Sequence, residues 1–430
     1  MMEKRTPMPV QEAVAAIMEH RIESRMEWTD LQEASGRYLA QDIQADHDVP
    51  PFDRSPYDGF AVRAYDTLEA SRDNPVSLHI AGDIGAGSVF GGTVEAGEAV
   101  RIMTGAPIPD GCDAVVMLEL AHDYEKDGHH YIDVKRPFHV NDNISFRGED
   151  TKRGTTVLQR GTVVHPGVTA VLASFGYAEV PTVQKPHIGV IATGSELLDI
   201  REPLQQGKIR NSNAYMIMAQ IEQAGGEAVS FGTVSDDFDE TLSTVQKALH
   251  SVDILLTTGG VSVGDYDYIP DILNELGASV HFNKVSMRPG SVTTAASLGP
   301  QLIYGLSGNP SACYVGFELF VRPVIQKVLG SPAPHLKKTK AVLGADFPKP
   351  NPFMRFVRAE LKDENGGWSA YPAGLDKSSS VTSLSDASAL IVLPGGTRGY
   401  EKGMDVDILL LHSAEGSEWP WDNIVRSYRS

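Results

Sequence analysis

Residues 187–196 read HIGVIATGSE and open the part of the chain that decides its fold. From there to residue 330, apolar runs alternate with amphipathic segments. The apolar runs are HIGVIAT (187–193), EAVSFGTV (227–234), DILLTTGG (253–260), SVHFNKV (279–285), SVTTAASL (291–298) and LIYGL (302–306). Strands that alternate with helices of roughly 10–15 residues indicate a largely parallel sheet covered by helices on both faces. We therefore predict a three-layer α/β domain here.

The chain on either side has a different pattern. Residues 8–19 (MPVQEAVAAIME) have the apolar spacing of an amphipathic helix that starts near Pro9, and residues 168–176 also suit a helix. Short alternating runs separated by Gly, Pro and Asp, from about residue 50 to 140, predict a small β domain. After the linker-like SPAPHLKK (331–338), further short runs predict a last β domain; they are FMRFVRAEL (353–361), ALIVLP (389–394) and VDILLL (406–411).

Composition narrows the class of protein. The 430 residues correspond to about three domains at roughly 150 residues each. A formal net charge of −19 argues against nucleic acid and anionic membranes as partners, because both are polyanions. With only Cys112 and Cys313 present, neither a disulfide framework nor a CxxC metal site is expected. The N-terminus has no apolar signal region, and no apolar stretch is long enough to span a bilayer. We expect a cytoplasmic protein.

Ligands of open parallel sheets bind where the strands end. The predicted strand ends are followed by polar or glycine-rich segments; these are TGSE (193–196), SDD (235–237), GGVSVGDYD (259–267), KVSMRPG (284–290) and SGNPS (307–311). Gly259, Gly260 and Gly264 allow backbone N–H groups to form a nest for phosphate, although a plain strand-to-helix turn would use the same residues. The loop matches neither a P-loop nor a Rossmann fingerprint.

Three carboxylates follow three of these strands: Glu196, Asp236 and Asp267. Together their hard oxygens would suit Mg²⁺ shared with substrate phosphates, whereas singly each also suits a helix N-terminus. Lys208 and Arg210 precede a helix for which we expect Ser212 or Asn213 to be the cap. They would contact an anion or lie in a solvated loop.

Other polar segments have the composition of turns, and by themselves they do not indicate a function. Asp53 and Asp58 lie in the proline-rich segment 50–61, and the segments 104–110 and 146–150 are similar. The serine cluster 378–380 suits a loop whose hydroxyls could hold an oxyanion.

Taken together, the motifs resemble the molybdopterin molybdenumtransferases, the MoeA and gephyrin E-domain family. Seven segments in order carry the resemblance: PPFDRSPYDGFA (50–61), TGAPIP (104–109), RGED (147–150), ATGSEL (192–197), GKIRNSN (207–213), TTGGVSVGDYDY (257–268) and SGNPSA (307–312).

The resemblance implies four domains and a homodimer. It implies an elongated α+β domain I from residues 1–50 and 141–182, an inserted β domain II (51–140), a molybdopterin-binding α/β domain III (183–330), a β-barrel-like domain IV (331–415) and a tail (416–430). Domain I would carry the dimer contact. The site would lie between domain III of one subunit and domain II of the other, so Asp58, Thr104 and Asp150 would face Glu196, Asp236 and Asp267.

The resemblance also implies the reaction, in which adenylylated molybdopterin and molybdate give AMP and molybdenum cofactor with Mg²⁺ on the carboxylates Glu196, Asp236 and Asp267. The residues expected to bind the molybdopterin substrate are Thr193, Gly194, Ser195, Asn211, Ser212, Gly259, Gly260, Ser262, Gly264, Gly308, Asn309 and Pro310. Those expected to bind molybdate are Lys284, Arg288, Arg358 and Ser378. Ser291 and Ser307 depart from the usual family pattern, which has Lys and Pro at these places, so a cation is lost at Ser291.

Two alternatives stay open at this point. Adenylyl transfer to molybdopterin is carried out by proteins that resemble residues 187–330 alone, and the additional β domains argue against it. A gephyrin-like scaffold would need no chemistry; we expect no additional N-terminal domain or long linker, which argues against this alternative. The molybdopterin adenylyltransferase is also a candidate partner.

Overall fold

The computed structural model describes residues 6–259, 268–350, 352–364, 366–396 and 398–424. The chain divides into two compact units. Unit 1 consists of Met1–Gln41, Arg160–Thr169 and Ala178–Ser430, and unit 2 of Asp42–Gln159 and Ala170–Tyr177.

A six-stranded sheet forms the centre of unit 1, in the order β14-β11-β15-β19-β18-β16. Its strands are β11 (His187–Thr193), β14 (Glu227–Val234), β15 (Ile254–Thr258), β16 (Ser279–Phe282), β18 (Thr294–Leu298) and β19 (Gln301–Leu306). β14, β11, β15 and β19 are parallel, whereas β18 runs antiparallel to its neighbours β19 and β16. Parallel neighbours need crossover connections; α3 (Asn213–Gln223) and α4 (Phe238–Leu249) provide two of them.

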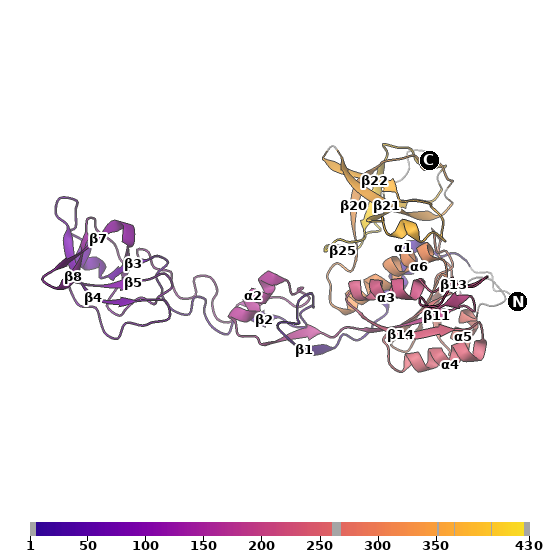
Figure 1. Cartoon of the computed structure of the whole chain (residues 1–430), viewed down its shortest axis with the longest axis horizontal. Coiled ribbons are helices and arrows are strands. Elements are labelled where there is room, and N and C mark those ends of the chain that lie inside the picture. The colour runs from indigo at the N-terminus through magenta and orange to yellow at the C-terminus, as the bar shows by residue number, and fades with distance from the viewer. Residues whose placement is uncertain (1–5, 260–267, 351, 365, 397, 425–430) are drawn as a thin grey trace. The chain divides into compact units, whose positions relative to one another are not determined.

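Both faces of this sheet are buried. Along β11, Ile188 and Val190 face one core and Ile191 faces the other. The first core includes α1 (Val10–Glu19), α3, α6 (Pro310–Gly316), the π-helical turn Phe317–Val321 and α7 (Arg322–Val328), and the second includes α4 and α5 (Ile269–Glu275). Figure 1 shows α3 and α6 above the strands β11 and β14, and α4 below them. The predicted three-layer α/β domain is confirmed.

The C-terminal strands close into a barrel. β21 pairs with β22 and β23, β22 with β20, β20 with β24, and β24 with β23, which leaves no free edge in this ring. The strands are β20 (His335–Leu343), β21 (Met354–Glu364), β22 (Gly367–Pro372), β23 (Ala389–Leu393) and β24 (Asp405–Leu410). Short strands β17 (Met287–Arg288) and β25 (Gly416–Ser417) pair with β21 and β20. The expected C-terminal β barrel is confirmed.

Unit 2 is built around a second six-stranded sheet, in the order β6-β3-β5-β4-β8-β7. The strands are β3 (Gly59–Val62), β4 (Val76–Ile84), β5 (Glu98–Ile102), β6 (Ala114–Met117), β7 (Ala121–Lys126) and β8 (His129–Val134). Only the β4–β5 pairing within this sheet is parallel. Its core includes Phe60, Val62 and Val116, as predicted for a small β domain.

The remaining elements are short. β1 (Met26–Asp30) pairs with β10 (Glu179–Val183) in unit 1, and β2 (Ile43–Gln44) pairs with β9 (Thr156–Leu158) in unit 2. β12 (Leu197–Leu198) pairs with β13 (Ile209–Arg210), and α2 spans Pro166–Ser174. Single 3₁₀ turns occur at Ala64–Thr67, Leu118–Leu120 and Thr382–Leu384. None of the helices in the described ranges is long and apolar enough to cross a membrane.

Candidate functional site

The loops after β11 and β14 are tied to each other at the carboxyl edge of the α/β sheet. The backbone N–H of Ser195 donates to Asp236 Oδ2 at 3.0 Å, and the N–H of Asp236 donates to Ser195 Oγ at 3.1 Å. The N–H of Gly194 also donates to the carbonyl of Val234 at 3.1 Å. The two carboxylate-bearing loops therefore have a fixed register.

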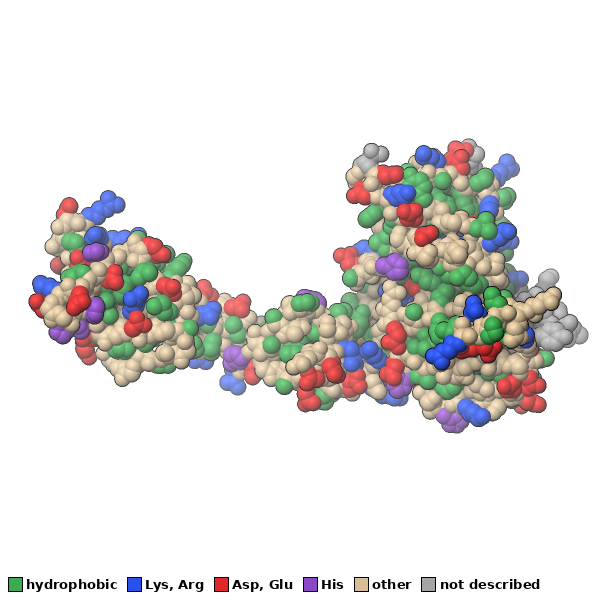
Figure 2. Space-filling model, in the orientation of Figure 1, with side chains coloured by type: hydrophobic (Ala, Val, Ile, Leu, Met, Phe, Trp, Pro, Cys, Tyr) green, Lys and Arg blue, Asp and Glu red, His purple; other side chains and the backbone are tan. Residues whose placement is uncertain are grey.

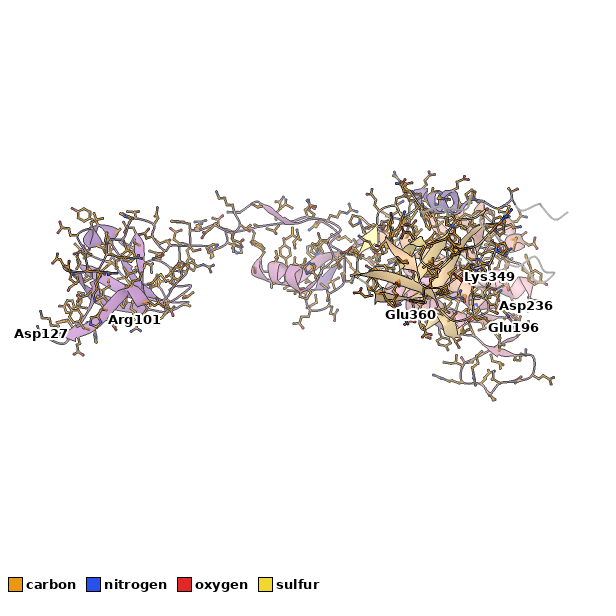
Figure 3. The ribbon with its side chains drawn as sticks, turned by 90° about the horizontal axis from the view of Figure 1, so that it is seen from above. Arg101, Asp127, Glu196, Asp236, Lys349 and Glu360 are labelled. Atoms are coloured by element: carbon orange, nitrogen blue, oxygen red, sulfur yellow. The ribbon has the colours of Figure 1, made fainter. Side chains whose placement is uncertain are left out.

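Glu196 folds back over a glycine in the same loop. A Cβ atom at Gly194, where φ is +147°, would lie 2.5 Å from Glu196 Oε2, so a larger residue here would displace this carboxylate. Figure 3 shows Glu196 and Asp236 at the same end of the α/β part of unit 1. Lys208 donates to the carbonyl oxygen of Ser195, so this lysine ties its own segment to the loop after β11.

A second glycine shapes the middle of the sheet edge. At Gly259, φ is +93°, and a Cβ atom would lie 2.4 Å from the carbonyl oxygen of Thr193. The N–H of Gly259 donates to the carbonyl of Leu306 at 3.1 Å, and a Cβ atom at Gly308 would lie 3.5 Å from the Gly259 Cα. The ends of β11, β15 and β19 thus approach one another closely, as a ligand cradle requires.

The helix cap in this region differs from the prediction. The expected caps were Ser212 or Asn213, but Ser212 already has helical backbone angles, with φ −88° and ψ −28°, and its side chain makes no cap bond. Asn211 caps instead, since its Oδ1 accepts from the N–H of Ala214 at 3.1 Å. Asn213 is then free for another role: its Nδ2 donates to the carbonyl of Gly308 at 2.8 Å.

Asn213 also leaves a polar atom without a partner. Its side chain is buried, and its Oδ1 has no hydrogen-bond partner among the described residues. A buried unpaired amide oxygen is costly, so this atom is suited to receive a donor from a bound ligand. The sequence marked Asn213 only as a cap candidate and did not reveal this position.

Some predicted residues of the edge cannot be placed. Gly260, Ser262, Gly264 and Asp267 lie outside the described residues. Within the described ranges, no group of three or more His, Cys, Asp or Glu side chains is arranged to hold a metal ion. The structure therefore brings Glu196 and Asp236 to one place and leaves the third predicted carboxylate undescribed.

Arg358 on β21 is a buried cation beside the barrel loop, which we define as residues 374–383. It is 1% exposed. Its Nε donates to Ser383 Oγ at 3.0 Å, and its Nη2 donates to the carbonyls of Leu375 and Lys377 at 3.2 and 3.4 Å. Its Nη1 is buried and has no partner among the described residues. Burial lowers the pKa of this guanidinium, while the nearby Asp376 carboxylate acts in the opposite direction.

Of the other predicted molybdate residues, Ser378 belongs to the barrel loop, Arg288 lies in β17 and Lys284 precedes β17. The carbonyl of Ser378 accepts from the N–H of Ser311 at 3.0 Å, which joins the barrel loop to the start of α6. Arg288 is exposed and pairs in register with Arg355, because β17 leaves the α/β sheet and joins β21. The carbonyl of Lys284 accepts from the N–H of Met8 at 3.0 Å. No hydrogen bond or ion pair between described residues joins the side chain of Lys284 or Arg288 to Arg358 or Ser378.

In unit 2 the structure joins two of the three predicted residues. Asp58 Oδ1 accepts from both the N–H and the Oγ1 hydroxyl of Thr104, at 2.6 and 2.7 Å. These two bonds, the backbone bond first, lower the pKa of Asp58 below its ordinary value. Asp150 is exposed, and its N–H donates to the carbonyl of Val49 at 3.0 Å.

The three segments that carry Asp58, Thr104 and Asp150 are joined through the backbone of Arg54. The backbone of Arg54 forms bridges with both Pro107 and Ser145, so the segments around 49–55, 104–108 and 145–151 lie together. The proline-rich segment 50–61 is therefore joined to the two other predicted turn segments within unit 2, and is not an isolated turn.

Comparison with known proteins covers nearly the whole chain. Residues 8–176 match the "MoeA N-terminal region (domain I and II)", residues 189–327 a "Probable molybdopterin binding domain", and residues 340–411 the "MoeA C-terminal region (domain IV)". The molybdopterin molybdenumtransferase of Bacillus subtilis (strain 168) is 57% identical over 427 residues, which cover 99% of each chain. That of Staphylococcus aureus (strain COL) is 47% identical over 416 residues, 97% of this chain and 98% of the relative.

A solved structure agrees with these matches. The crystal structure of a molybdopterin biosynthesis MoeA protein from Pyrococcus horikoshii superposes with a TM-score of 0.84 at 29% identity, covering 94% of this chain and 99% of that one. The resemblance inferred from the seven sequence segments is therefore confirmed. The chain belongs to the molybdopterin molybdenumtransferase, or MoeA, family.

Proposed function

We propose that this enzyme takes adenylylated molybdopterin and molybdate, hydrolyses the bond to the adenylate, and leaves molybdenum on the dithiolene while AMP departs. Its relatives over the full length are named molybdopterin molybdenumtransferases. The reaction needs two anion sites, one for the phosphates and one for the oxyanion that delivers the metal. The chain offers residues suited to each.

The observation that carries the proposal is the unpaired Nη1 of Arg358. A buried guanidinium N–H without a partner costs free energy, and a tetrahedral oxyanion would satisfy it with a charge-assisted hydrogen bond. Adenylyl transfer would require no second oxyanion site on a separate barrel. Arg358 and the hydroxyl of Ser378 are therefore the proposed molybdate contacts, with Lys284 and Arg288 as the further cations.

The phosphate side is proposed to lie at the sheet edge. Gly259 and Gly308 leave room for a ligand at the ends of β15 and β19, and Asn213 Oδ1 is available to accept a hydrogen bond from it. Thr193, Gly194, Ser195, Asn211, Ser212, Asn309 and Pro310 belong to the same edge. Their role would be to orient the substrate so that its adenylate bond lies next to Glu196 and Asp236.

The carboxylate pair fits a magnesium ion. Glu196 and Asp236 provide hard oxygen donors, and the absence of a Cβ at Gly194 preserves the space into which the Glu196 carboxylate folds. Bound there, Mg²⁺ would neutralise charge on the departing phosphate. Asp236 and Ser195 would hold the two loops in register, so that both carboxylates reach the same point.

The net charge of −19 does not conflict with anionic substrates. On the face drawn in Figure 2, Lys and Arg side chains lie among the Asp and Glu side chains. The charge that matters is local: Arg358 is buried at the proposed molybdate site, and Lys208 donates to the backbone of the loop that carries Glu196. A site for anions can therefore form on an acidic protein.

The proposal includes a homodimer whose site is shared between subunits, the four-domain division given above, and a cytoplasmic location. The Asp58–Thr104 pair supports a second half of the site, because an exposed carboxylate held ionised by two hydrogen bonds is ready to contact a polar ligand or metal-bound water. Both cysteines are free thiols, which suits a reducing compartment. A passing contact with the molybdopterin adenylyltransferase would deliver the substrate.

Incubation of the purified protein with adenylylated molybdopterin, molybdate and Mg²⁺ tests the function. We expect AMP release that depends on all three, with molybdenum retained on the product. Formation of adenylylated molybdopterin from molybdopterin and ATP would contradict the proposal. Glu196→Ala serves as the inactive control, and its thermal unfolding shows whether it folds.

A further inference from the structure

Ser311, the second residue of α6, joins the α/β domain to the barrel. Its N–H donates to the carbonyl of Ser378 at 3.0 Å, and its hydroxyl donates to the carbonyl of Ser380 at 2.5 Å. The side chain is completely buried, so solvent does not compete for either bond. Ser311 directly follows the SGNP turn (307–310), whose Gly308 accepts from Asn213.

The barrel loop to which Ser311 is hydrogen-bonded also orients the side chain of Arg358. Two of the guanidinium nitrogens bind carbonyl and hydroxyl oxygens of this loop, at Leu375, Lys377 and Ser383. Asp376 in the same loop forms ion pairs with Arg355 and Lys349, at 2.5 and 3.0 Å. All of those anchors come from the barrel. Among the residues that the structure describes, the bonds from Ser311 tie residues 378–380 to the edge of the α/β sheet.

We propose that Ser311 is a positioning residue for the oxyanion site: it holds the barrel loop so that Ser378 and Arg358 present their donors to molybdate beside the SGNP turn. This inference rests on the proposed function. Ser311 does not itself touch molybdate, because both of its polar groups are used by the loop.

The physical reason lies in the difference between the two ends of the loop. On the barrel side, an arginine and two ion pairs hold it strongly, but they move with the barrel. Without the hydroxyl of Ser311, residues 378–380 lose one of the two hydrogen bonds that Ser311 makes to them. A shift of about 1 Å at a binding group is enough to weaken a site substantially. The sheet-edge residues that face adenylylated molybdopterin would not move. The defect should therefore be confined to molybdate.

The test compares Ser311→Ala with Ser388→Ala in the full-length protein. Ser388 is a matched control, because its hydroxyl accepts from the N–H of Leu361 at 3.0 Å within the barrel domain. Ser388→Ala therefore also removes a hydrogen-bonded serine hydroxyl, but one that does not contact α6. We expect Ser311→Ala to raise the KM for molybdate about five- to tenfold, the loss of roughly one hydrogen bond, with kcat and the KM for adenylylated molybdopterin changed by less than about twofold. Molybdate binding measured by calorimetry should weaken by the same factor.

A selective rise in the KM and Kd for molybdate in Ser311→Ala, with Ser388→Ala like the wild type, supports the inference. Wild-type affinity in Ser311→Ala, or equal losses in both variants, overturns it while leaving the proposed function intact, provided that the wild type releases AMP. A wild type that neither releases AMP nor binds molybdate overturns both.

Discussion

Ser195 and Asp236 hydrogen-bond to each other twice, each using its backbone N–H as donor and its side-chain oxygen as acceptor. This reciprocal pair joins loops that are 41 residues apart in the chain. Asp236 therefore has two roles that substitutions can separate. Its carboxylate carries negative charge for the proposed magnesium ion, and the Oδ2 atom of that carboxylate accepts the hydrogen bond that fixes the loop after β11.

Asp236→Asn should separate them. The amide oxygen can still accept from Ser195, so we expect thermal unfolding close to that of the wild type, whereas the lost charge should raise the Mg²⁺ concentration for half-maximal AMP release by about tenfold or more. Asp236→Ala should lower both magnesium affinity and the unfolding temperature. An Asp236→Asn variant with unchanged magnesium dependence would contradict the proposed ligand role.

Gly259→Ala should destabilise the sheet edge more than an ordinary glycine replacement. A positive φ alone costs an alanine about 1–2 kcal/mol, and here the added Cβ would also meet the carbonyl of Thr193 at 2.4 Å. Gly277→Ala is the matched control, since Gly277 also has a positive φ, +66°, but nothing within 4 Å of its Cβ position. We expect Gly259→Ala to lose roughly 1–3 kcal/mol more than Gly277→Ala in urea unfolding. Equal losses would show that the backbone at Gly259 yields easily.

Much of this architecture was predictable because periodicity records burial. The alternation of Ile188, Val190 and Ile191 between two cores is the reason that the HIGVIAT segment is apolar throughout, and such a segment is typical of a strand covered on both faces. The glycines at 194 and 259 were likewise expected near a ligand, since their spacing follows the strand ends. These features depend on local sequence and on one rule of sheet topology.

Other features depend on contacts that no local pattern encodes. In the segment Asn211-Ser212-Asn213 all three side chains can cap a helix, and the backbone angles decide that Asn211 does. The shift of β17 from the α/β sheet to the barrel results from its pairing with β21. The unpaired Nη1 of Arg358 is visible only when the barrel loop is in place. For this arginine, the resemblance indicated a role that the residues alone did not.

Glu318→Gln should flatten the dependence of stability on pH. Glu318 lies in the π-helical turn, is 3% exposed, and burial raises the pKa of its carboxyl, while Arg322 and the hydrogen bond from Gln220 act in the opposite direction. A raised pKa in the folded state means that stability is fully present below the unfolded pKa, near 4.5, and is lost as pH rises toward the folded pKa. In that interval the wild type should lose up to about 1.4 kcal/mol per pH unit.

The comparison is urea unfolding at pH 5 and pH 8. We expect a smaller difference between the two pH values in Glu318→Gln than in the wild type, whereas Glu275→Gln, at an exposed position on α5, should keep the wild-type difference. Wild-type behaviour in Glu318→Gln would mean that Glu318 is ionised in the folded protein throughout this range.

Arg358→Lys tests the proposed molybdate site while keeping its positive charge. Lysine cannot reproduce the planar fork that reaches Ser383, Leu375 and Lys377 together. We expect the KM for molybdate to rise about tenfold or more, with the KM for adenylylated molybdopterin near the wild-type value. If both KM values rise together, the arginine supports the whole site and does not select the oxyanion.

A mixture of two inactive variants tests whether the site is shared between subunits. Asp58→Ala removes the carboxylate that Thr104 holds in unit 2, and Glu196→Ala removes one from the loop after β11 in unit 1. If residues of both units from different subunits complete each site, one of the two sites in every mixed dimer carries no substitution, while the other carries both. Refolding or co-expressing the variants in equal amounts should then restore roughly a quarter of wild-type AMP release, because about half of the dimers are mixed and one of their two sites is intact.

Two controls should stay inactive. One is each variant alone, and the other is a mixture of Glu196→Ala with Asp236→Ala, in which both changes lie in the same unit. Recovery in that second mixture as well, or in neither, would exclude a site built from unit 2 of one subunit and unit 1 of the other.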